Sequence, residues 1–410
     1  MKTIKITLTA LAFSAAAFAQ TGQTVNEGIL YVSPGTLVSV ESDFDNTAMG
    51  EYENNGEVIF KRNFNNDGIT TFDPSYTGYT RFTGSVQQDI TGSIPADFYD
   101  VLFHNSNWQP AFRLYGDISI SGNADFYQGI VQNDVFGGII IFENEATHTN
   151  VSNNSHVDGH VVKNGDTGFI YPIGDNQYFR YAAISAVDAD GSFMGKYFFE
   201  DSNPVYPHAS KAENIILIDN TEYWTVDKTS GQADIILTLS WDEDNTTPAQ
   251  IIGTQAGELH IVRWDTDQSK WVDEGGIVDE GEKTVTTPVN VSGYGVFTLA
   301  RVKPVLPPAQ DVVIYNGVTP DGDGQNDYFI IENITNFPGN KVEVYNRWGV
   351  KVFETLDYDT RGNVFSGFSS GRVTVSQSQR LPTGTYFYVI EYPANGTTVK
   401  KTGYLYISAE

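Results

Sequence analysis

The feature that most constrains the fold of this chain is the recurrence of short β-prone segments, at roughly 20 residues, from Val25 to Gly168. Turn-forming residues separate the segments, as in Asn54-Asn55-Gly56 and Asn65-Asn66-Asp67-Gly68, because Asn, Asp and Gly tolerate the backbone conformations of tight turns. A period of roughly 20 residues is the coil length of a parallel β-solenoid, in which each coil packs on its neighbours. The spacing therefore predicts a solenoid-like head over residues 20–168. A β-sandwich with long loops is the alternative.

The segments after residue 168 follow a different spacing. Between residues 169 and 302, strands recur at roughly 8 to 12 residues and alternate apolar with polar side chains. The clearest of them are Glu222–Val226, Asp234–Trp241, Glu258–Trp264 and Gly293–Leu299. This pattern predicts an antiparallel β-sandwich as the middle domain.

Prolines mark the boundary of a third domain. Pro304, Pro307 and Pro308 restrict the backbone and cannot donate to a strand ladder, so we predict an extended linker over residues 303–310. Residues 311–410 are then predicted to form a small β-sandwich, with a hairpin around Asn346-Arg347-Trp348-Gly349. The predicted fold class of the whole chain is all-β.

The N-terminus has the composition of a secretory signal peptide. Lys2 and Lys5 accompany the apolar stretch Ile6–Phe18, and Ala17-Phe18-Ala19 is a small-x-small cleavage site. We therefore expect residues 1–19 to be removed and the mature chain to begin at Gln20.

Composition excludes several classes of function. The chain has 24 Lys and Arg residues against 51 Asp and Glu residues, a formal net charge of −27, which repels nucleic-acid phosphates and anionic membrane surfaces. We therefore expect no nucleic-acid partner. The absence of cysteine excludes disulfides, thiolate metal sites and a cysteine nucleophile.

Four ordered motifs near the C-terminus carry a family resemblance. They are Val318–Asp327, which contains Asp321-Gly322-Asp323-Gly324-Gln325-Asn326-Asp327, followed by Tyr345–Gly349, Leu381–Tyr388 and Gly403–Ile407. Together they resemble the gliding motility-associated C-terminal domain, the type B sorting signal of the type IX secretion system of Bacteroidetes. Many members carry Trp-Asp-Gly where this chain has Phe365-Ser366-Gly367, a departure that we interpret as a subfamily variant.

The resemblance implies an export route and a location. The signal peptide would deliver the chain to the periplasm, and the type IX secretion translocon would then recognise the C-terminal domain for passage across the outer membrane. Type B domains are associated with a small outer-membrane protein of the PorP/SprF type. The resemblance therefore implies a secreted, cell-surface protein that is associated with the outer membrane. Proteins with such tails commonly serve as adhesins, filament components or secreted hydrolases.

Three carboxylates in the first motif are the candidate metal ligands. Asp321, Asp323 and Asp327 converge if the backbone curls at the intervening glycines, and gathered oxygen atoms suit a hard cation such as Ca²⁺. The spacing follows that of an EF-hand loop, but Ile330 stands where the bidentate Glu of such a loop would be. We therefore predict a structural Ca²⁺ site that is not an EF-hand. A solvated Asp-Gly turn is the alternative.

Two other groups of polar residues have ordinary structural interpretations. His148, His156 and His160 lack the His-Glu-x-x-His spacing of a zinc site, so we expect a solvated loop. The acidic runs Asp188–Gly191 and Asp242–Asn245 fall between predicted strands, where we expect plain turns.

The sequence contains no phosphate loop or dinucleotide fingerprint. We therefore expect a non-enzymatic adhesin, or a component of a gliding or surface filament complex, whose partner is a surface glycan or a filament subunit. The alternative is a secreted polysaccharide-binding protein or a neutral-glycan hydrolase with a β-solenoid head.

The head has little positive charge with which to bind an acidic glycan. Arg81 and Arg113 are the only Arg or Lys residues between Phe64 and Val162, which argues against a polyanionic substrate. In a glycan-binding head, the aromatic side chains that contact sugar would be Trp108, Tyr115 and Tyr127. We expect these three side chains to pack in the core instead.

Overall fold

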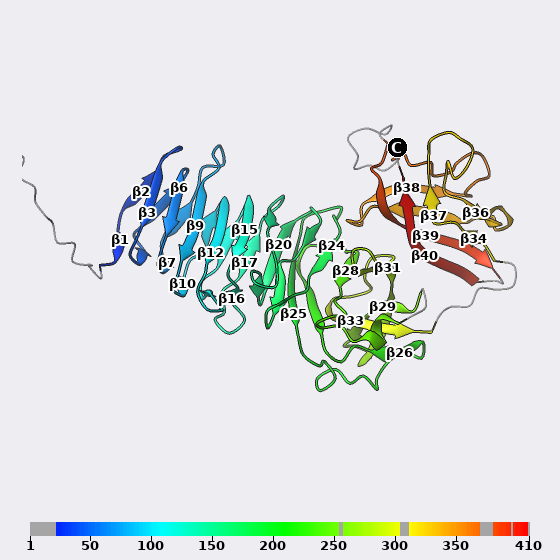
Figure 1. Ribbon diagram of the computed structural model, residues 1–410, viewed down its shortest axis with the longest axis horizontal. Coiled ribbons are helices and arrows are strands. Elements are labelled where there is room, and N and C mark those ends of the chain that lie inside the picture. The colour runs from blue at the N-terminus through cyan, green and yellow to red at the C-terminus, as the bar shows by residue number, and fades with distance from the viewer. Residues whose placement is uncertain (1–21, 254–256, 304–310, 370–379, 395–396, 409–410) are drawn as a thin grey trace, which may run out of the picture.

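The computed structural model describes residues 22–253, 257–303, 311–369, 380–394 and 397–408. The predicted signal peptide, residues 1–19, and residues 304–310 of the predicted linker lie outside these ranges. The regular secondary structure of the described residues is almost all β-strand, with one short helix, α1 (Ala249–Ile252), and one 3-10 turn, η1 (Ile334–Asn336). The prediction of an all-β fold is confirmed. A long head leads into a middle domain and then into a C-terminal domain (Figure 1).

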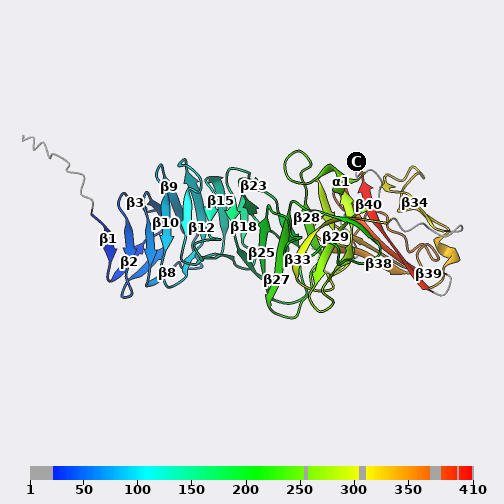
Figure 2. The same cartoon turned by 90° about the horizontal axis from the view of Figure 1, so that it is seen from below.

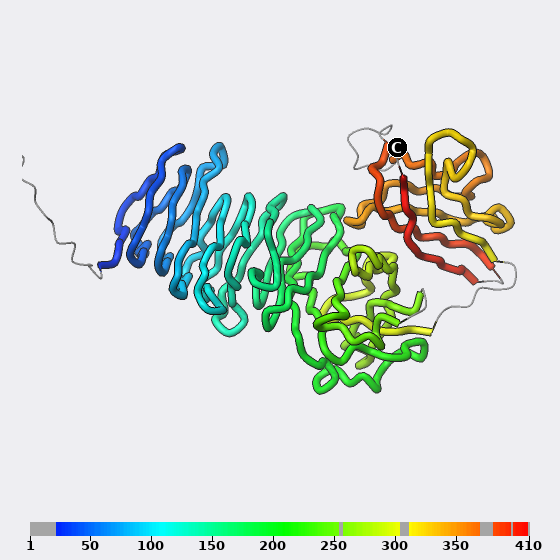
Figure 3. The backbone as a smooth tube through the Cα atoms, in the orientation of Figure 1, coloured from blue at the N-terminus to red at the C-terminus, as the bar shows by residue number. Residues whose placement is uncertain are grey.

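The head is a parallel β-solenoid of about six turns, as predicted, and Figure 3 shows its stacked coils. Each turn contributes one strand to each of three sheets, which we name A, B and C. Sheet A contains β1 (Thr24–Asn26), β4 (Phe44–Asn46), β7 (Phe64–Asn66), β10 (Gln88–Thr91), β13 (Phe112–Leu114), β16 (Val131–Gln132), β19 (Val157–Asp158), β22 (Ile173–Asp175) and β23 (Tyr178–Phe179). Sheet B begins with β2 (Ile29–Val32), β5 (Glu51–Asn54), β8 (Ile69–Thr71), β11 (Ala96–Phe98), β14 (Ile118–Ile120), β17 (Ile140–Phe142) and β20 (Val161–Gly165). Sheet C contains β3 (Leu37–Val40), β6 (Glu57–Phe60), β9 (Tyr79–Gly84), β12 (Asp100–Asn105), β15 (Asn123–Gln128) and β18 (Thr147–Thr149).

Similar side chains stack at equivalent positions of successive coils. In sheet C, Phe60, Phe82, Phe103 and Phe126 are paired in register. Their ring centroids lie 5.7, 5.9 and 5.2 Å apart in turn. The stacked rings bury a large apolar area along the solenoid axis, which stabilises the coil stack.

A ladder of asparagines fixes the first three coils. The side-chain amide of Asn26 donates to Oδ1 of Asn46, and that of Asn46 donates to Oδ1 of Asn66, both at 2.8 Å. The Asn46 amide also donates to the carbonyl of Ile69 at 2.9 Å. Asn46 is fully buried, and buried amides require such partners. The ladder therefore specifies the register of the coils.

The middle domain is an antiparallel sandwich that grows out of the solenoid. Sheet B continues because β25 (Gly191–Phe198) pairs antiparallel with β20. The strands that follow are β27 (Tyr223–Ser230), β33 (Gly295–Val302), β29 (Leu259–Asp265) and β30 (Lys270–Gly275), with β26 (Ile215–Ile218) on β33. A second sheet contains β21 (Phe169–Ile170), β24 (Ala182–Ile184), β28 (Leu237–Ser240), β32 (Thr284–Thr286) and β31 (Ile277–Asp279). Side chains of both sheets share one hydrophobic core with the head.

The C-terminal domain has a hydrophobic core of its own. Its main sheet contains β35 (Gly317–Val318), β40 (Thr397–Ile407), β39 (Gly384–Ala394), β37 (Lys341–Tyr345) and β38 (Lys351–Leu356), and β34 (Val313–Ile314) pairs with β36 (Ile331–Glu332). The predicted hairpin around the Asn346–Gly349 turn is formed by β37 and β38. β40 lies against β31 of the middle domain, so the C-terminal domain sits beside the sandwich (Figure 2).

Candidate functional site

The three predicted metal ligands lie together in the loop between β35 and β36. One carboxylate oxygen from each of Asp321, Asp323 and Asp327 lies within 4.8 Å of the other two. Gly322 and Gly324 have φ values of 84° and 87°, so the backbone makes the predicted curl at its glycines. Asp321 and Asp323 are exposed, and Asp327 is half-buried.

The same carboxylates fold the loop by accepting backbone N–H groups. Asp327 accepts from Gly322 at 2.6 Å and from Gly324 at 2.8 Å, through its two oxygens. Asp321 accepts from the N–H of Asp323 at 3.0 Å. Because a carboxylate oxygen has more than one lone pair, these hydrogen bonds leave capacity for a cation. The all-oxygen donor set fits Ca²⁺, and the backbone contacts are those of Asx turns.

Two histidines of the head, His148 and His156, lie at least partly in its interior. His156 is fully buried, with Nδ1 3.0 Å from the carbonyl of Ser152, and burial lowers its pKa to about 4. His148 lies among three phenylalanine rings, and burial lowers its pKa as well. The expectation of a solvated loop is wrong for these two residues. Among the described residues, the histidines form no metal-binding group.

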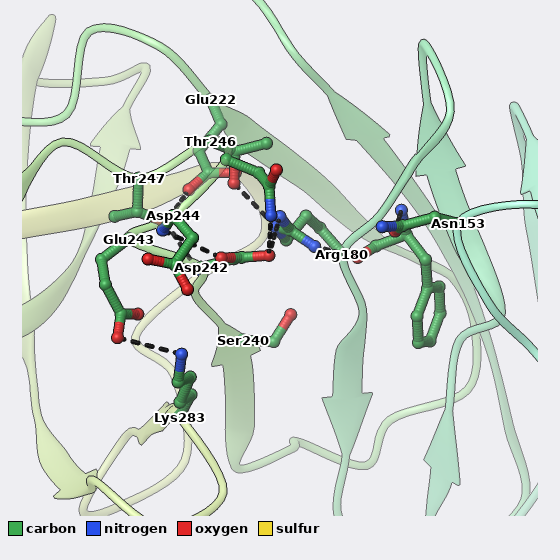
Figure 4. A network of polar contacts seen from close by, with 12 residues as sticks. Asn153, Arg180, Glu222, Ser240, Asp242, Glu243, Asp244, Thr246, Thr247 and Lys283 are labelled. Carbon is green, nitrogen blue, oxygen red and sulfur yellow. Dashed lines mark hydrogen bonds and ion pairs between the residues drawn. The ribbon is translucent and has the colours of Figure 1, made fainter.

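The acidic run Asp242–Asn245 is a turn, as expected, but it also anchors a polar network (Figure 4). Nη2 of the buried Arg180 donates to Oδ2 of Asp242 at 2.6 Å, and Nε donates to the hydroxyl of Thr246 at 2.7 Å. Behind this pair, Glu222 accepts from the hydroxyls of Tyr197 and Thr247. Arg180 follows the last strand of sheet A, so the network joins the end of the head to the sandwich.

Two buried carboxyl groups accompany this network. Burial raises the pKa of Asp219 to about 7, with a further contribution from Glu222, and burial raises the pKa of Glu222 itself. No described residue donates a hydrogen bond to Oδ2 of Asp219. Sequence reasoning missed the network because its partners are distant in the chain: Arg180 and Asp242 are 62 residues apart. Local spacing carries no signal for such a contact.

The four motifs of the C-terminal domain form one structural unit. A Cβ built on Gly367 would lie 3.0 Å from Pro320, in the acidic loop, and 3.9 Å from Ile407. The carbonyl of Gly367 accepts the N–H of Leu381 at 2.8 Å. A known family model, described as the CHU_C Type IX secretion signal domain, matches the segment that holds all four motifs. Residues 312–407 are a type IX secretion signal domain.

This sorting domain is the C-terminal signal of proteins that the type IX secretion system of Bacteroidetes exports. The resemblance seen in the sequence motifs is therefore confirmed. The sorting domain supports export by that system and a location on the cell surface or outside the cell. Within the described ranges, no helix has the length and apolar character needed to cross a membrane.

Outside the sorting domain, the chain has little similarity to known proteins. No curated protein matches the chain. Among solved structures, the crystal structure of dimeric latent PorU from Porphyromonas gingivalis is similar, with 11% sequence identity and a TM-score of 0.16. The similarity covers 54% of this chain and 24% of that one. It carries no argument about function.

A cleft of about 480 Å³ lies between the middle domain and the sorting domain. Trp241, Glu243 and Lys283 line it from the middle domain, and Asn316 and Tyr404 line it from the sorting domain. Glu243 and Lys283 form an ion pair at 2.9 Å, so they largely neutralise each other. Polar and apolar side chains of both domains therefore line the space between them.

Three aromatic side chains of the head are exposed. Trp108 is 88% exposed, Tyr127 is 61% exposed and Tyr115 is 42% exposed. The expectation that they pack in the core is wrong. Trp108 lies in a loop at a corner of the coil and Tyr127 lies near the end of β15. Tyr127 occupies an outward position of β15, because successive strand residues alternate between the two faces, whereas Trp108 and Tyr115 lie outside the strands.

Proposed function

We propose that this protein is a non-enzymatic cell-surface adhesin, or a component of a gliding or surface filament complex, exported by the type IX secretion system. The observation that carries this proposal is the sorting domain at residues 312–407 behind an elongated β head. The head and the middle domain share a sheet and a hydrophobic core, so they form a stiff rod. Such a rod suits a protein that presents a binding surface away from the cell.

We further propose that the sorting domain stays at the outer membrane, bound to a protein of the PorP/SprF type. In a bacterium with a working type IX system, protease added to intact cells should digest the full-length protein. A chain that ends at residue 310 should be protected in the periplasm. Equal protease access for both chains would contradict export through this domain. Release of the full-length protein into the medium, without a copurifying outer-membrane protein, would contradict attachment alone.

The role at the surface is tested separately from export. Cells that lack the protein should attach less well to surfaces if it is an adhesin, and they should lose an ordered structure in electron micrographs if it belongs to a filament. The alternative of a neutral-glycan hydrolase predicts polysaccharide turnover by the purified protein. Turnover that a single carboxylate substitution abolishes would overturn the non-enzymatic proposal.

We propose that the acidic loop of the sorting domain holds a structural Ca²⁺. The convergence of Asp321, Asp323 and Asp327 supports this role. A cation there would offset the mutual repulsion of three carboxylates and would stabilise the first loop of the domain.

A further inference from the structure

Four stacked corner loops of the head differ from the rest of the chain in their chemistry. They connect sheet C to sheet A in consecutive coils and comprise residues 84–88, 105–111, 127–130 and 150–156. We call them the corner ridge. They contain no Asp, Glu, Lys or Arg, although the chain has a net charge of −27. The same corner of the two preceding coils carries Glu41, Asp43, Lys61 and Arg62.

The corner ridge presents apolar rings to solvent. Trp108 is 88% exposed and Tyr127, in the next coil, is 61% exposed. The Tyr127 ring is held edge-on against His104, with the ring centroids 4.7 Å apart. Val86, in the coil before that of Trp108, is 40% exposed. Three consecutive coils therefore place an exposed apolar side chain at this corner.

Hydrogen bonds hold the loops of the corner ridge to one another. The side-chain amide of Asn105 donates to the carbonyl of Val86 at 2.7 Å, and that of Gln87 donates to the carbonyl of Pro110 at 2.7 Å. Oε1 of Gln109 accepts the N–H of Ile130 at 2.7 Å. The ridge is thus built on paired coils, so little conformational entropy is lost when a ligand binds to it.

The remaining side chains of the corner ridge are mostly amides and hydroxyls. Those that are exposed or half-exposed include Ser85, Asn107, Gln128, Asn150, Ser152, Asn153 and Asn154. Amides donate and accept hydrogen bonds, as do the hydroxyls of a sugar. A polyanion would require cationic partners and a polycation would require carboxylates. The ridge provides neither of these.

We propose that the corner ridge binds a neutral polysaccharide, with Trp108 and Tyr127 stacked on the apolar faces of sugar rings and the flanking amides bonded to sugar hydroxyls. This inference rests on the proposed role of the head as a binding element, and it names the class of ligand. A protein partner is disfavoured because only three isolated apolar side chains rise from an amide-rich surface, whereas the core of a protein interface is a contiguous apolar patch.

The test is electrophoresis of the full-length mature protein through gels that contain galactomannan, xyloglucan or amylopectin, with alginate as an anionic comparison. At least one neutral gel should slow the protein, and alginate should not. The double variant Trp108→Ala/Tyr127→Ala should lose at least about tenfold in apparent affinity for that glycan, because two stacking contacts are removed. Circular dichroism should show an unchanged fold, because both side chains are exposed.

Tyr115→Ala is the matched control. Tyr115 is also an exposed aromatic of the head, but it follows β13 at a different corner, beside Phe136, and its loss should leave retardation unchanged. Failure of every neutral gel to slow the protein, or equal retardation of the double variant and the wild type, would overturn the proposal. Because the purified protein is used, either result leaves the test of export by protease access unaffected.

Discussion

Gly349 of the sorting domain lies directly against Ser185 of the middle domain. A Cβ built on Gly349 would lie 2.7 Å from the Cβ of Ser185, and Gly349 has a φ of 70°. The turn from Asn346 to Gly349 therefore serves two purposes. It closes the hairpin of β37 and β38, and it brings the sorting domain into contact with its cargo.

Replacing Gly349 by alanine should loosen this contact. The substitution adds strain at positive φ, about 1 to 2 kcal/mol, and it also forces the Cβ into Ser185. Gly339→Ala is the matched control, because Gly339 has a φ of 85° with no atom near its added Cβ. Both variants should lose stability, but only Gly349→Ala should increase the maximum dimension in small-angle scattering. Identical scattering profiles would contradict a role for this contact in docking.

The asparagine ladder should make Asn46 a large contributor to the stability of the head. Asn46→Ala removes one of the two acceptors of the Asn26 amide, a donor to Asn66 and a donor to the carbonyl of Ile69. We expect a loss of about 2 to 4 kcal/mol in the free energy of unfolding, since buried polar groups lose their partners. Asn123→Ala, which removes exposed hydrogen bonds in the same solenoid, should cost less than about 1 kcal/mol. Urea denaturation measures both, and equal midpoints would refute the prediction.

Asp219 should make the protein less stable at neutral pH than at acidic pH. Its folded-state pKa of about 7 exceeds the ordinary value of 3.8, so between these values the folded chain holds a proton that the unfolded chain releases. The contribution to stability is complete below about pH 4 and falls as the pH rises through 7. Asp219→Asn should flatten this part of the profile of melting temperature between pH 5 and 8. The exposed Asp267→Asn should leave the profile as it is. An unchanged slope in Asp219→Asn would show that other groups control it.

Calcium should stabilise the sorting domain if the acidic loop binds it. At a free Ca²⁺ concentration about 100 times the Kd, the gain in the free energy of unfolding is about 2.7 kcal/mol. Calorimetry of the full-length protein with Ca²⁺ and with a chelator measures this gain. Asp323→Asn should remove most of it. Asp359→Asn, at an exposed position of the same domain where φ is 61°, should retain it, since Asn tolerates that conformation. Identical melting in Ca²⁺ and in chelator would exclude the metal.

The elements that could be predicted from the sequence are those whose contacts repeat or are local. Asn46 and Asn66 are 20 residues apart and meet because each coil repeats the previous one, so the period of the sequence indicates the fold. The acidic loop is local, since Gly322 and Gly324 curl the backbone between its carboxylates. The family resemblance also depends on short motifs, which are read directly from the chain.

The features that could not be predicted depend on contacts that are neither local nor repeated at a fixed spacing in the sequence. Arg180 meets Asp242 across 62 residues, and nothing in either neighbourhood indicates the other. The prediction that Trp108 packs in the core is wrong, because a corner loop has no alternation that distinguishes inward from outward positions. The burial of His156 was missed for the same reason. The continuity of sheet B depends on the pairing of β20 with β25, which strand spacing alone does not specify.

Sheet B runs from β2 to β30 without a break, and its strands in the head lie across the long axis of the molecule (Figure 1). Its interstrand hydrogen bonds therefore point along that axis. A pull on the head is borne as tension by rows of hydrogen bonds, and within the solenoid the load is divided among three sheets at every coil. Beyond Val302, where β33 ends, the force passes into the covalent chain and into the contact around Gly349. The contact around Gly349 is not covalent, so a loaded molecule would yield there first.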